Sequence, residues 1–148
     1  MLRDLDRSLL HQLTAGLALT PNTSEAARLL GHDVTGTGAR PGAEDASDIA
    51  REYGAVVTLH GALADPSGRT WEASTGSTGL ATSGSGDVLA GAIAGVLARG
   101  ADPVQAACWG THLHGAAGDR LGARIAPVGY LARELLDELP LVLTELQT

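Results

Sequence analysis

The stretch Thr82-Ser83-Gly84-Ser85-Gly86-Asp87-Val88-Leu89-Ala90-Gly91 decides the fold and the chemistry of this chain. It passes from a glycine-rich run straight into a largely apolar helical pattern. Glycine adopts positive φ without strain and lets a ligand approach the backbone closely. The unpaired N–H groups at the start of a helix, together with the positive end of its macrodipole, bind anions. We therefore expect a phosphate-binding turn in which Gly84, Ser85 and Gly86 donate hydrogen bonds.

Asp87 extends the chemistry of this turn. A carboxylate at the beginning of a helix is stabilised in its ionised form and is available as a general base. It would act on the group that lies beside the bound phosphate. The alternative is that Asp87 only caps the helix. The turn lacks the Gly-Lys-Ser/Thr of a Walker loop and the Gly-x-Gly-x-x-Gly of a dinucleotide fingerprint, so neither of those motifs explains it.

The composition restricts the class of protein. A length of 148 residues suits one domain with a core, and we expect residues 1–148 to form a single domain. The net charge of -7, with arginine as the only basic residue besides histidine, argues against nucleic acid as a partner. Cys108 is the single cysteine, which excludes an internal disulfide and suits the cytoplasm. The longest apolar run, 88–98, falls short of the roughly 20 residues that cross a membrane.

Local patterns predict an alternation of helices and strands. Asn22, followed by Glu25 three residues later, predicts a capped helix start, and Asp102-Pro103 predicts another. Helices are expected over 2–13, 22–31, 44–53, 88–99, 103–121 and 131–139, and strands over 17–20, 56–59 and both sides of a turn at 65–68. The alternation indicates an α/β fold. The strands are few for a complete sheet, so we expect the domain to be truncated at its N-terminal side.

The helix that begins at Val88 is expected to be buried on all sides, because its apolar residues cover nearly every face. Gly91 and Gly95 would let neighbouring elements pack unusually close to it. The last helix is expected to stop before Pro140. The acidic run 44–48 is expected to be a solvated helix face.

Several residues that often carry chemistry are expected to be structural here. His112 and His114 lie two apart and point in different directions on a helix, so they do not readily share a metal. Asp119 is expected to cap or to pair with a neighbouring arginine. Cys108 is expected in the core, and so is Trp109, for which stacking on a ligand ring is the alternative.

Four segments of the chain carry a family resemblance. They are Thr20-Pro21-Asn22-Thr23-Ser24-Glu25, Leu59-His60-Gly61, Gly79-Leu80-Ala81-Thr82-Ser83-Gly84-Ser85-Gly86-Asp87-Val88-Leu89-Ala90-Gly91 and His114-Gly115-Ala116-Ala117-Gly118-Asp119. In this order and spacing, with Glu138-Leu139-Pro140 as the closing segment, they resemble the C-terminal half of the ADP- or ATP-dependent NAD(P)H-hydrate dehydratases, which have a ribokinase-like fold. Asn22 and His60 stand where that family has His and Lys.

The resemblance implies a repair reaction on hydrated NADH or NADPH. Asp87 would take the proton of the nicotinamide hydroxyl and, with Asn22, contact the substrate. Gly84, Ser85 and Gly86 would hold the phosphates of ADP or ATP together with Mg²⁺. The segment His60, Gly61, Ala62, Leu63 and Ala64 would lie against the AMP portion.

Two alternatives to the repair reaction stay open. A kinase of a small alcohol, such as a vitamin precursor, would use the same aspartate and the same phosphate-binding turn. A half-domain that binds nucleotide without turnover would need only the turn. A domain that lacks sheet strands leaves polar edges and apolar surface exposed, so we also expect a homo-oligomer.

Overall fold

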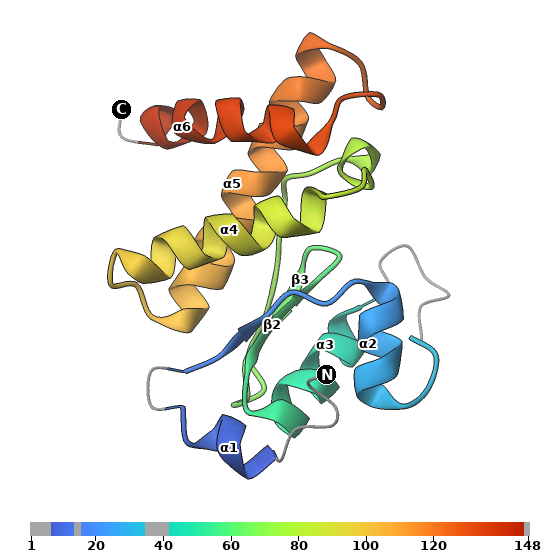
Figure 1. Cartoon of the computed structure of the whole chain (residues 1–148), viewed down its shortest axis with the longest axis vertical. Coiled ribbons are helices and arrows are strands. Elements are labelled where there is room, and N and C mark those ends of the chain that lie inside the picture. The colour runs from blue at the N-terminus through green and yellow to red at the C-terminus, as the bar shows by residue number, and fades with distance from the viewer. Residues whose placement is uncertain (1–6, 14–15, 35–41, 147–148) are drawn as a thin grey trace. The chain divides into compact units, whose positions relative to one another are not determined.

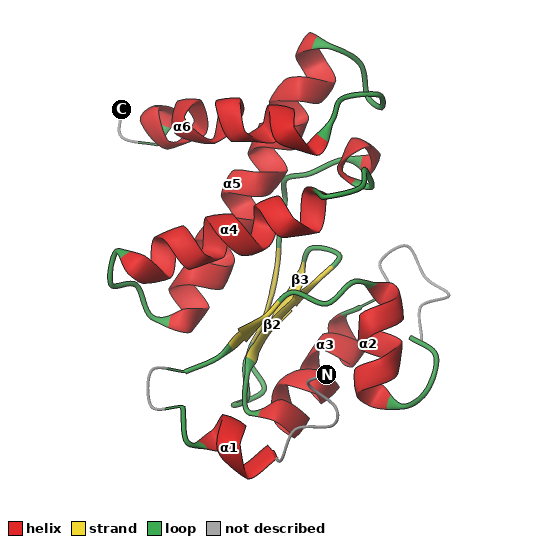
Figure 2. Ribbon diagram, viewed as in Figure 1, coloured by secondary structure: helices red, strands yellow, loops and turns green. Residues whose placement is uncertain are grey.

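The computed structural model describes residues 7–13, 16–34 and 42–146, which form two compact units. Unit 1 comprises residues 1–72 and 102–107, and unit 2 comprises 73–101 and 108–148. The secondary structure is mixed in unit 1 and helical in unit 2 (Figure 2). None of the helices in the described ranges has both the length and the apolar character needed to cross a bilayer.

Unit 1 is built on a four-stranded mixed sheet. Its strands are β1 (Ala18–Leu19), β2 (Val56–Leu59), β3 (Ala62–Ala64) and β4 (Thr70–Glu72), in the order β1-β2-β3-β4. β1 runs parallel to β2, and the pairs β2–β3 and β3–β4 are antiparallel. Among the described residues of unit 1, three complete helices accompany the sheet, α1 (Arg7–His11), α2 (Thr23–Leu30) and α3 (Ala43–Tyr53). α2 and α3 lie side by side (Figure 1).

The core of unit 1 forms where α3 packs on β2 and β3. All four residues of β2 are buried, as expected for a short β-branched strand covered on both faces. Ile49 and Tyr53 of α3 are also buried, and the Tyr53 hydroxyl donates to the carbonyl of Leu29 at 3.1 Å. Small and aliphatic side chains, together with Tyr53, thus form this core without phenylalanine.

The predicted turn at 65–68 is confirmed and has a buried carboxylate at its centre. Asp65 accepts hydrogen bonds from the backbone N–H and hydroxyl of Ser67 at 2.9 and 2.7 Å and from Arg69 Nε at 2.7 Å. Burial acts to raise the pKa of Asp65, but these hydrogen bonds outweigh it and lower the pKa to about 2. The carboxylate therefore stays charged and fixes the β3–β4 connection.

Unit 2 is a helical assembly. Its elements are η2 (Thr78–Leu80), α4 (Ser85–Ala98), η3 (Ala132–Glu134), α6 (Leu135–Glu145) and the part of α5 (Pro103–Arg124) that follows Ala107. Its main buried apolar cluster consists of Leu113, Ala117, Leu121, Tyr130, Leu135 and Val142.

A buried carboxylate connects α5 to α6 within unit 2. Glu138 accepts from Arg120 Nε and from an Arg124 terminal nitrogen, both at 2.8 Å. The hydrogen bond from Arg120 is the main cause that lowers the pKa of Glu138. The expectation that Asp119 pairs with a neighbouring arginine was wrong, because Arg120 turns its guanidinium toward α6 and Asp119 binds backbone instead.

The expectation that α4 is buried on all sides was also wrong. Of its residues only Ser85 and Ile93 are buried. A side-chain Cβ placed on Gly91 or Gly95 would meet nothing within 4 Å, so these glycines permit no close packing. The error has a simple cause: alanine and glycine count as apolar in a sequence pattern but bring little side-chain area that must be removed from water.

Three further expectations need correction. Asp45, within the acidic run, is buried, whereas its neighbour Glu44 is exposed. Trp109 is exposed by nearly half, 48%, and meets the ring of His112 edge-on. α6 continues through Pro140, which is exposed, because Val142 beyond it is buried in the core of unit 2. The loss of one N–H at the proline is offset by this burial.

Other local expectations were confirmed, with one boundary changed. Asn22 and Glu25 form a reciprocal capping box, and α2 ends at a left-handed Gly31. Asp102 accepts from Gln105 N–H at 2.9 Å at the start of α5. In the N-terminal segment the described helix covers only Arg7–His11, and the part of the expected helix before residue 7 lies outside the described residues.

Candidate nucleotide and substrate site

The glycine-rich turn leads directly into α4. Gly84 is the N-cap residue, with φ of 87°, and Ser85 is the first helical residue. Ser85 N–H donates to Thr82 O at 3.2 Å, and the N–H groups of Asp87 and Val88 donate to Gly84 O at 3.1 and 3.2 Å. Within the described part of the chain, no backbone oxygen accepts from the N–H of Gly84 or Gly86. These two amides are therefore the donors that an anion would find at this helix end.

Asp87 is exposed and lies in the first turn of α4. Among the described residues its carboxylate has no hydrogen-bond or ion-pair partner, so it does not cap the helix. A carboxylate in this place is stabilised by the helix dipole and is open to a ligand. The arrangement can hold a phosphate on two amides and accept a proton beside it.

The middle of α5 holds the glycine-rich segment by hydrogen bonds to residues at its start. Asp119 Oδ2 accepts from Gly76 N–H at 2.9 Å, and Thr75 Oγ1 donates to His112 O at 3.3 Å. A Cβ on Gly115 would lie 2.4 Å from Thr75 Oγ1, so only glycine admits this contact. The helix and the segment therefore meet backbone to backbone.

His114 makes the deepest of these contacts. Its Nε2 lies 2.9 Å from Ser85 Oγ, and both side chains are buried. Burial lowers the pKa of His114, and a hydrogen bond with the Ser85 backbone opposes the shift. Sequence reasoning assigned this histidine a structural role without naming its partner. The signal was available, since His114 opens the His-Gly-x-Ala-Gly-Asp segment that supplies the rest of the support.

The expected residues of unit 1 form a separate group. Asn22 Oδ1 accepts from Glu25 N–H, and Glu25 Oε2 accepts from Asn22 N–H, both at 2.9 Å. Thr23 Oγ1 lies 2.7 Å from His60 Nε2. The start of α2 and the end of β2 are thus linked, and His60 is placed beside the cap that contains Asn22.

His60 and Gly61 form the two-residue connection between β2 and β3. Both have positive φ, 51° and 85°, as a tight hairpin requires. His60 is exposed, whereas Leu63 and Ala64 of β3 are buried in the core of unit 1. Any contact of this segment with a ligand would therefore come from His60, Gly61 and backbone atoms rather than from the side chains of Leu63 and Ala64.

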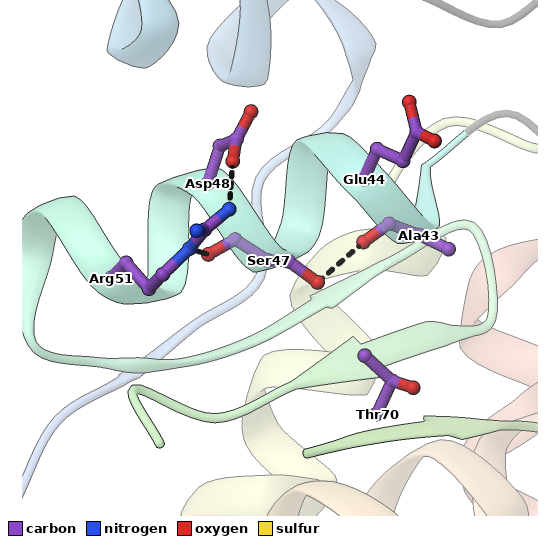
Figure 3. Close-up of a pocket in the computed structure, with 6 residues that line it drawn as sticks. All are labelled: Ala43, Glu44, Ser47, Asp48, Arg51 and Thr70. Carbon is purple, nitrogen blue, oxygen red and sulfur yellow. Dashed lines mark hydrogen bonds and ion pairs between the residues drawn. The ribbon is translucent and has the colours of Figure 1, made fainter. Parts of the chain in front are cut away.

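A hollow of about 490 Å³ lies along α3 and contains none of these residues (Figure 3). Its lining is Ala43, Glu44, Ser47, Asp48, Arg51 and Thr70. Arg51 pairs with Asp48, and Ser47 Oγ donates to Ala43 O at 2.8 Å, so these three side chains bind partners on their own helix. No residue of the glycine-rich turn lines this hollow.

Metal ligands are sparse around the candidate residues. In the described ranges, no three His, Cys, Asp or Glu side chains are gathered so that they could hold a metal ion. Mg²⁺ is commonly bound by one or two carboxylates together with the phosphates of a nucleotide. Asp87 suits that mode, and a cage made entirely of protein ligands does not.

Solved structures establish the class of protein. The ADP/ATP-dependent NAD(P)H-hydrate dehydratase of Bacillus subtilis, co-crystallised with ATP/Mg²⁺, is 34% identical with a TM-score of 0.80, over 88% of this chain and 48% of that one. A ribokinase-like superfamily protein of Enterococcus faecalis V583 is 25% identical with a TM-score of 0.68, over 86% of this chain and 44% of that one. The chain has the ribokinase-like α/β fold, as the sequence predicted.

The sequence comparisons then identify the family within that class. Residues 2–141 match the Carb_kinase family, described as NAD(P)H-hydrate dehydratase. The ADP-dependent (S)-NAD(P)H-hydrate dehydratase of Xanthomonas campestris pv. campestris is 46% identical over 131 residues, which are 86% of this chain and 45% of that protein. This chain belongs to the NAD(P)H-hydrate dehydratase family, which confirms the predicted resemblance. It spans less than half the length of the Xanthomonas relative.

Proposed function

We propose that this chain supplies the phosphate-binding turn and the general base of a nucleotide-dependent NAD(P)H-hydrate dehydratase. The observation that carries the proposal is the exposed carboxylate of Asp87 in the first turn of α4, beside the unpaired amides of Gly84 and Gly86. Family membership supplies the substrate class, because relatives named for this reaction match most of the chain.

The proposed reaction has two steps. Asp87 accepts the proton of the hydroxyl at C6 of the hydrated nicotinamide, and the oxygen attacks the terminal phosphorus of ADP or ATP. A new P–O bond forms as the bond to the rest of the nucleotide breaks, which releases AMP or ADP. The C–O bond then breaks, inorganic phosphate leaves, a proton departs from the neighbouring ring carbon, and the dihydronicotinamide is restored.

The remaining candidate residues take binding roles in this proposal. The amides of Gly84 and Gly86 receive the phosphate, and Ser85 lies between them. Mg²⁺ supplies charge neutralisation on the nucleotide phosphates when it is bound. Asn22 contacts the hydrated substrate. The hairpin residues His60 and Gly61, followed by Ala62, lie against the AMP portion of the nucleotide.

Location in the cytoplasm and assembly into a homo-oligomer stay predictions. Sedimentation analysis will test the assembly.

The decisive experiment follows the recovery of NADH absorbance from hydrated NADH with Mg²⁺ and either ADP or ATP. Wild type should restore NADH, and Asp87→Asn should lose at least about a hundredfold in rate, the usual contribution of a general base. Asp137→Asn is the matched control, since Asp137 is also an exposed aspartate in the first turn of a helix, α6. It should keep the wild-type rate.

The other outcomes distinguish the alternatives. Equal losses in both variants, or no loss in Asp87→Asn, would remove Asp87 from the mechanism. A folded wild type that binds Mg²⁺-ADP but restores no NADH would indicate a nucleotide-binding half without turnover.

A further inference from the structure

The contact between His114 and Ser85 lies at the centre of the glycine-rich turn. His114 is 7% exposed and Ser85 is 4% exposed, and His114 Nε2 is 2.9 Å from Ser85 Oγ. Ser85 stands between the two glycines whose amides are unpaired, and two residues before Asp87. This is the one buried polar side chain of α4, and it meets a buried side chain of α5.

A buried polar pair of this kind is costly to break. Removal of one partner leaves the other without a hydrogen bond away from water, and that penalty exceeds the net value of the bond itself. The hydroxyl of Ser85 is therefore held in one place by the imidazole. Because Ser85 is the first residue of α4, the direction of the first-turn amides follows from its position.

A second contact fixes the same helix further along. A Cβ on Gly110 of α5 would lie 2.4 Å from Ile93 Cγ1 and 2.9 Å from Ile93 N, so the two helices touch closely there. Ile93 is buried. Gly110 and His114 are one turn apart on α5, and they hold α4 at Ile93 and at Ser85 respectively. These two contacts fix the axis of α4, and the direction of the free amides in its first turn follows from that axis.

The imidazole is suited to a fixed role. Its pKa is lowered by burial, so it is neutral near pH 7 and brings no charge of its own to a phosphate site. It also lies behind the turn, bonded to the Ser85 side chain, whereas Gly84, Gly86 and Asp87 are exposed. His114 thus acts on the site through Ser85 without direct contact with a ligand.

We propose that His114 is a positioning residue that holds the first turn of α4, through Ser85, in the orientation that presents the amides of Gly84 and Gly86 to the nucleotide phosphate. The consequence for nucleotide binding rests on the proposed function. The orientation of the turn does not, and the two parts are tested by separate measurements.

The variants are His114→Ala, His114→Gln and Ser85→Ala, with His112→Gln as the matched control. His112 is a half-buried imidazole on the same helix whose ring meets Trp109 rather than the turn. Its carbonyl, which accepts from Thr75, is unaffected by that change. Glutamine at 114 retains a side-chain donor and acceptor of similar reach. Ser85→Ala tests the same contact from the other side if His114→Ala fails to fold.

The first measurement is amide hydrogen exchange at Ser85, Asp87 and Val88, whose N–H groups close the turn. His114→Ala and Ser85→Ala should each exchange about tenfold faster at these amides, because their local opening becomes easier. Exchange at Ala117, in the core of unit 2, should be unchanged. His114→Gln should recover most of the protection, and His112→Gln should match wild type.

The second measurement is the Kd for Mg²⁺-ADP by calorimetry. His114→Ala and Ser85→Ala should raise it about fivefold, the worth of one buried hydrogen bond, and His112→Gln should leave it unchanged. Unchanged exchange at the turn in His114→Ala and Ser85→Ala would overturn the proposal. So would faster exchange that extends equally to Ala117, or faster exchange at the turn with an unchanged Kd. If wild type binds no Mg²⁺-ADP, the proposed function fails, and the exchange data alone decide whether His114 positions the turn.

Discussion

Replacement of Glu138 by glutamine should destabilise unit 2 by about 2 kcal/mol at neutral pH. The side chain of Glu138 is 5% exposed and accepts charge-assisted hydrogen bonds from Arg120 and Arg124, each at 2.8 Å. Such bonds contribute about 1.5–3 kcal/mol when fully buried. The arginine side chains are 35% and 61% exposed, so solvent screens them, and we assign about 1 kcal/mol to each bond.

Glu145→Gln is the matched control. Glu145 also pairs with Arg120, but its side chain is 62% exposed. Exposed ion pairs contribute about 0.2–1 kcal/mol, so this variant should lose no more than about 0.5 kcal/mol. Both variants replace a carboxylate by an amide of the same shape on α6, and they differ chiefly in burial.

Urea unfolding measures the difference in unfolding free energy between each variant and wild type. The fluorescence of Trp109 reports on unit 2 when all proteins also carry Trp71→Phe, which removes the tryptophan of unit 1. Equal losses for Glu138→Gln and Glu145→Gln would refute the claim that burial sets the value of this cluster. A loss below about 0.5 kcal/mol for Glu138→Gln would refute the estimate itself.

The same cluster predicts a pH dependence with a definite sign. The pKa of Glu138 in the folded chain lies below its ordinary value of 4.5, chiefly because Arg120 donates to the carboxylate. A depressed carboxylate pKa stabilises the fold above the unfolded value, and this contribution is lost as the pH falls through the folded value. The difference in unfolding free energy between wild type and Glu138→Gln should thus be constant above about pH 5 and shrink at lower pH.

Three further predictions concern stability elsewhere in the chain. Asp65→Asn should destabilise unit 1 by about 1–2 kcal/mol, because the turn loses a charged acceptor for Ser67 and Arg69. Since the pKa of Asp65 is about 2, its contribution should be lost only between about pH 4 and pH 2, which acid titration of unfolding will show. Gly115→Ala should destabilise unit 2 by about 1–3 kcal/mol, because the new methyl group would meet Thr75 at 2.4 Å. Gly91→Ala, in open space on α4, should instead raise stability by about 0.5–1 kcal/mol in thermal unfolding, and a loss there would contradict the described exposure.

Three predictions that depended only on hydrogen bonds between neighbouring residues were confirmed. The Asn22–Glu25 capping box, the turn at Asp65 and the helix start at Asp102 each involve hydrogen bonds that reach at most four residues along the sequence. Their geometry is set by the residue types and their spacing, and distant packing leaves it unchanged. The start of α4 directly after the glycine-rich turn was also confirmed, because it needs only glycines followed by a helical pattern, whereas the binding of an anion there stays a prediction.

The predictions that depended on packing partners were the ones that needed correction. Nothing in the sequence near Val88 shows that α4 leaves Gly91 and Gly95 facing open space. The partner of Asp119 is Gly76, 43 positions earlier, and local sequence offered two nearer arginines. Pro140 ends helices as a rule, yet α6 passes through it because burial beyond the proline outweighs one missing hydrogen bond.

By itself, the sequence determined the family and the α/β class, and it predicts the place where an anion would bind, because these depend on motifs and on hydrogen bonds within a few residues. Only the tertiary structure decided that the His114 side chain holds the Ser85 hydroxyl. That contact joins residues 29 positions apart, and its strength comes from the exclusion of water around both side chains. Burial depends on how the elements pack in three dimensions, and it cannot be read from the order of residues along the chain.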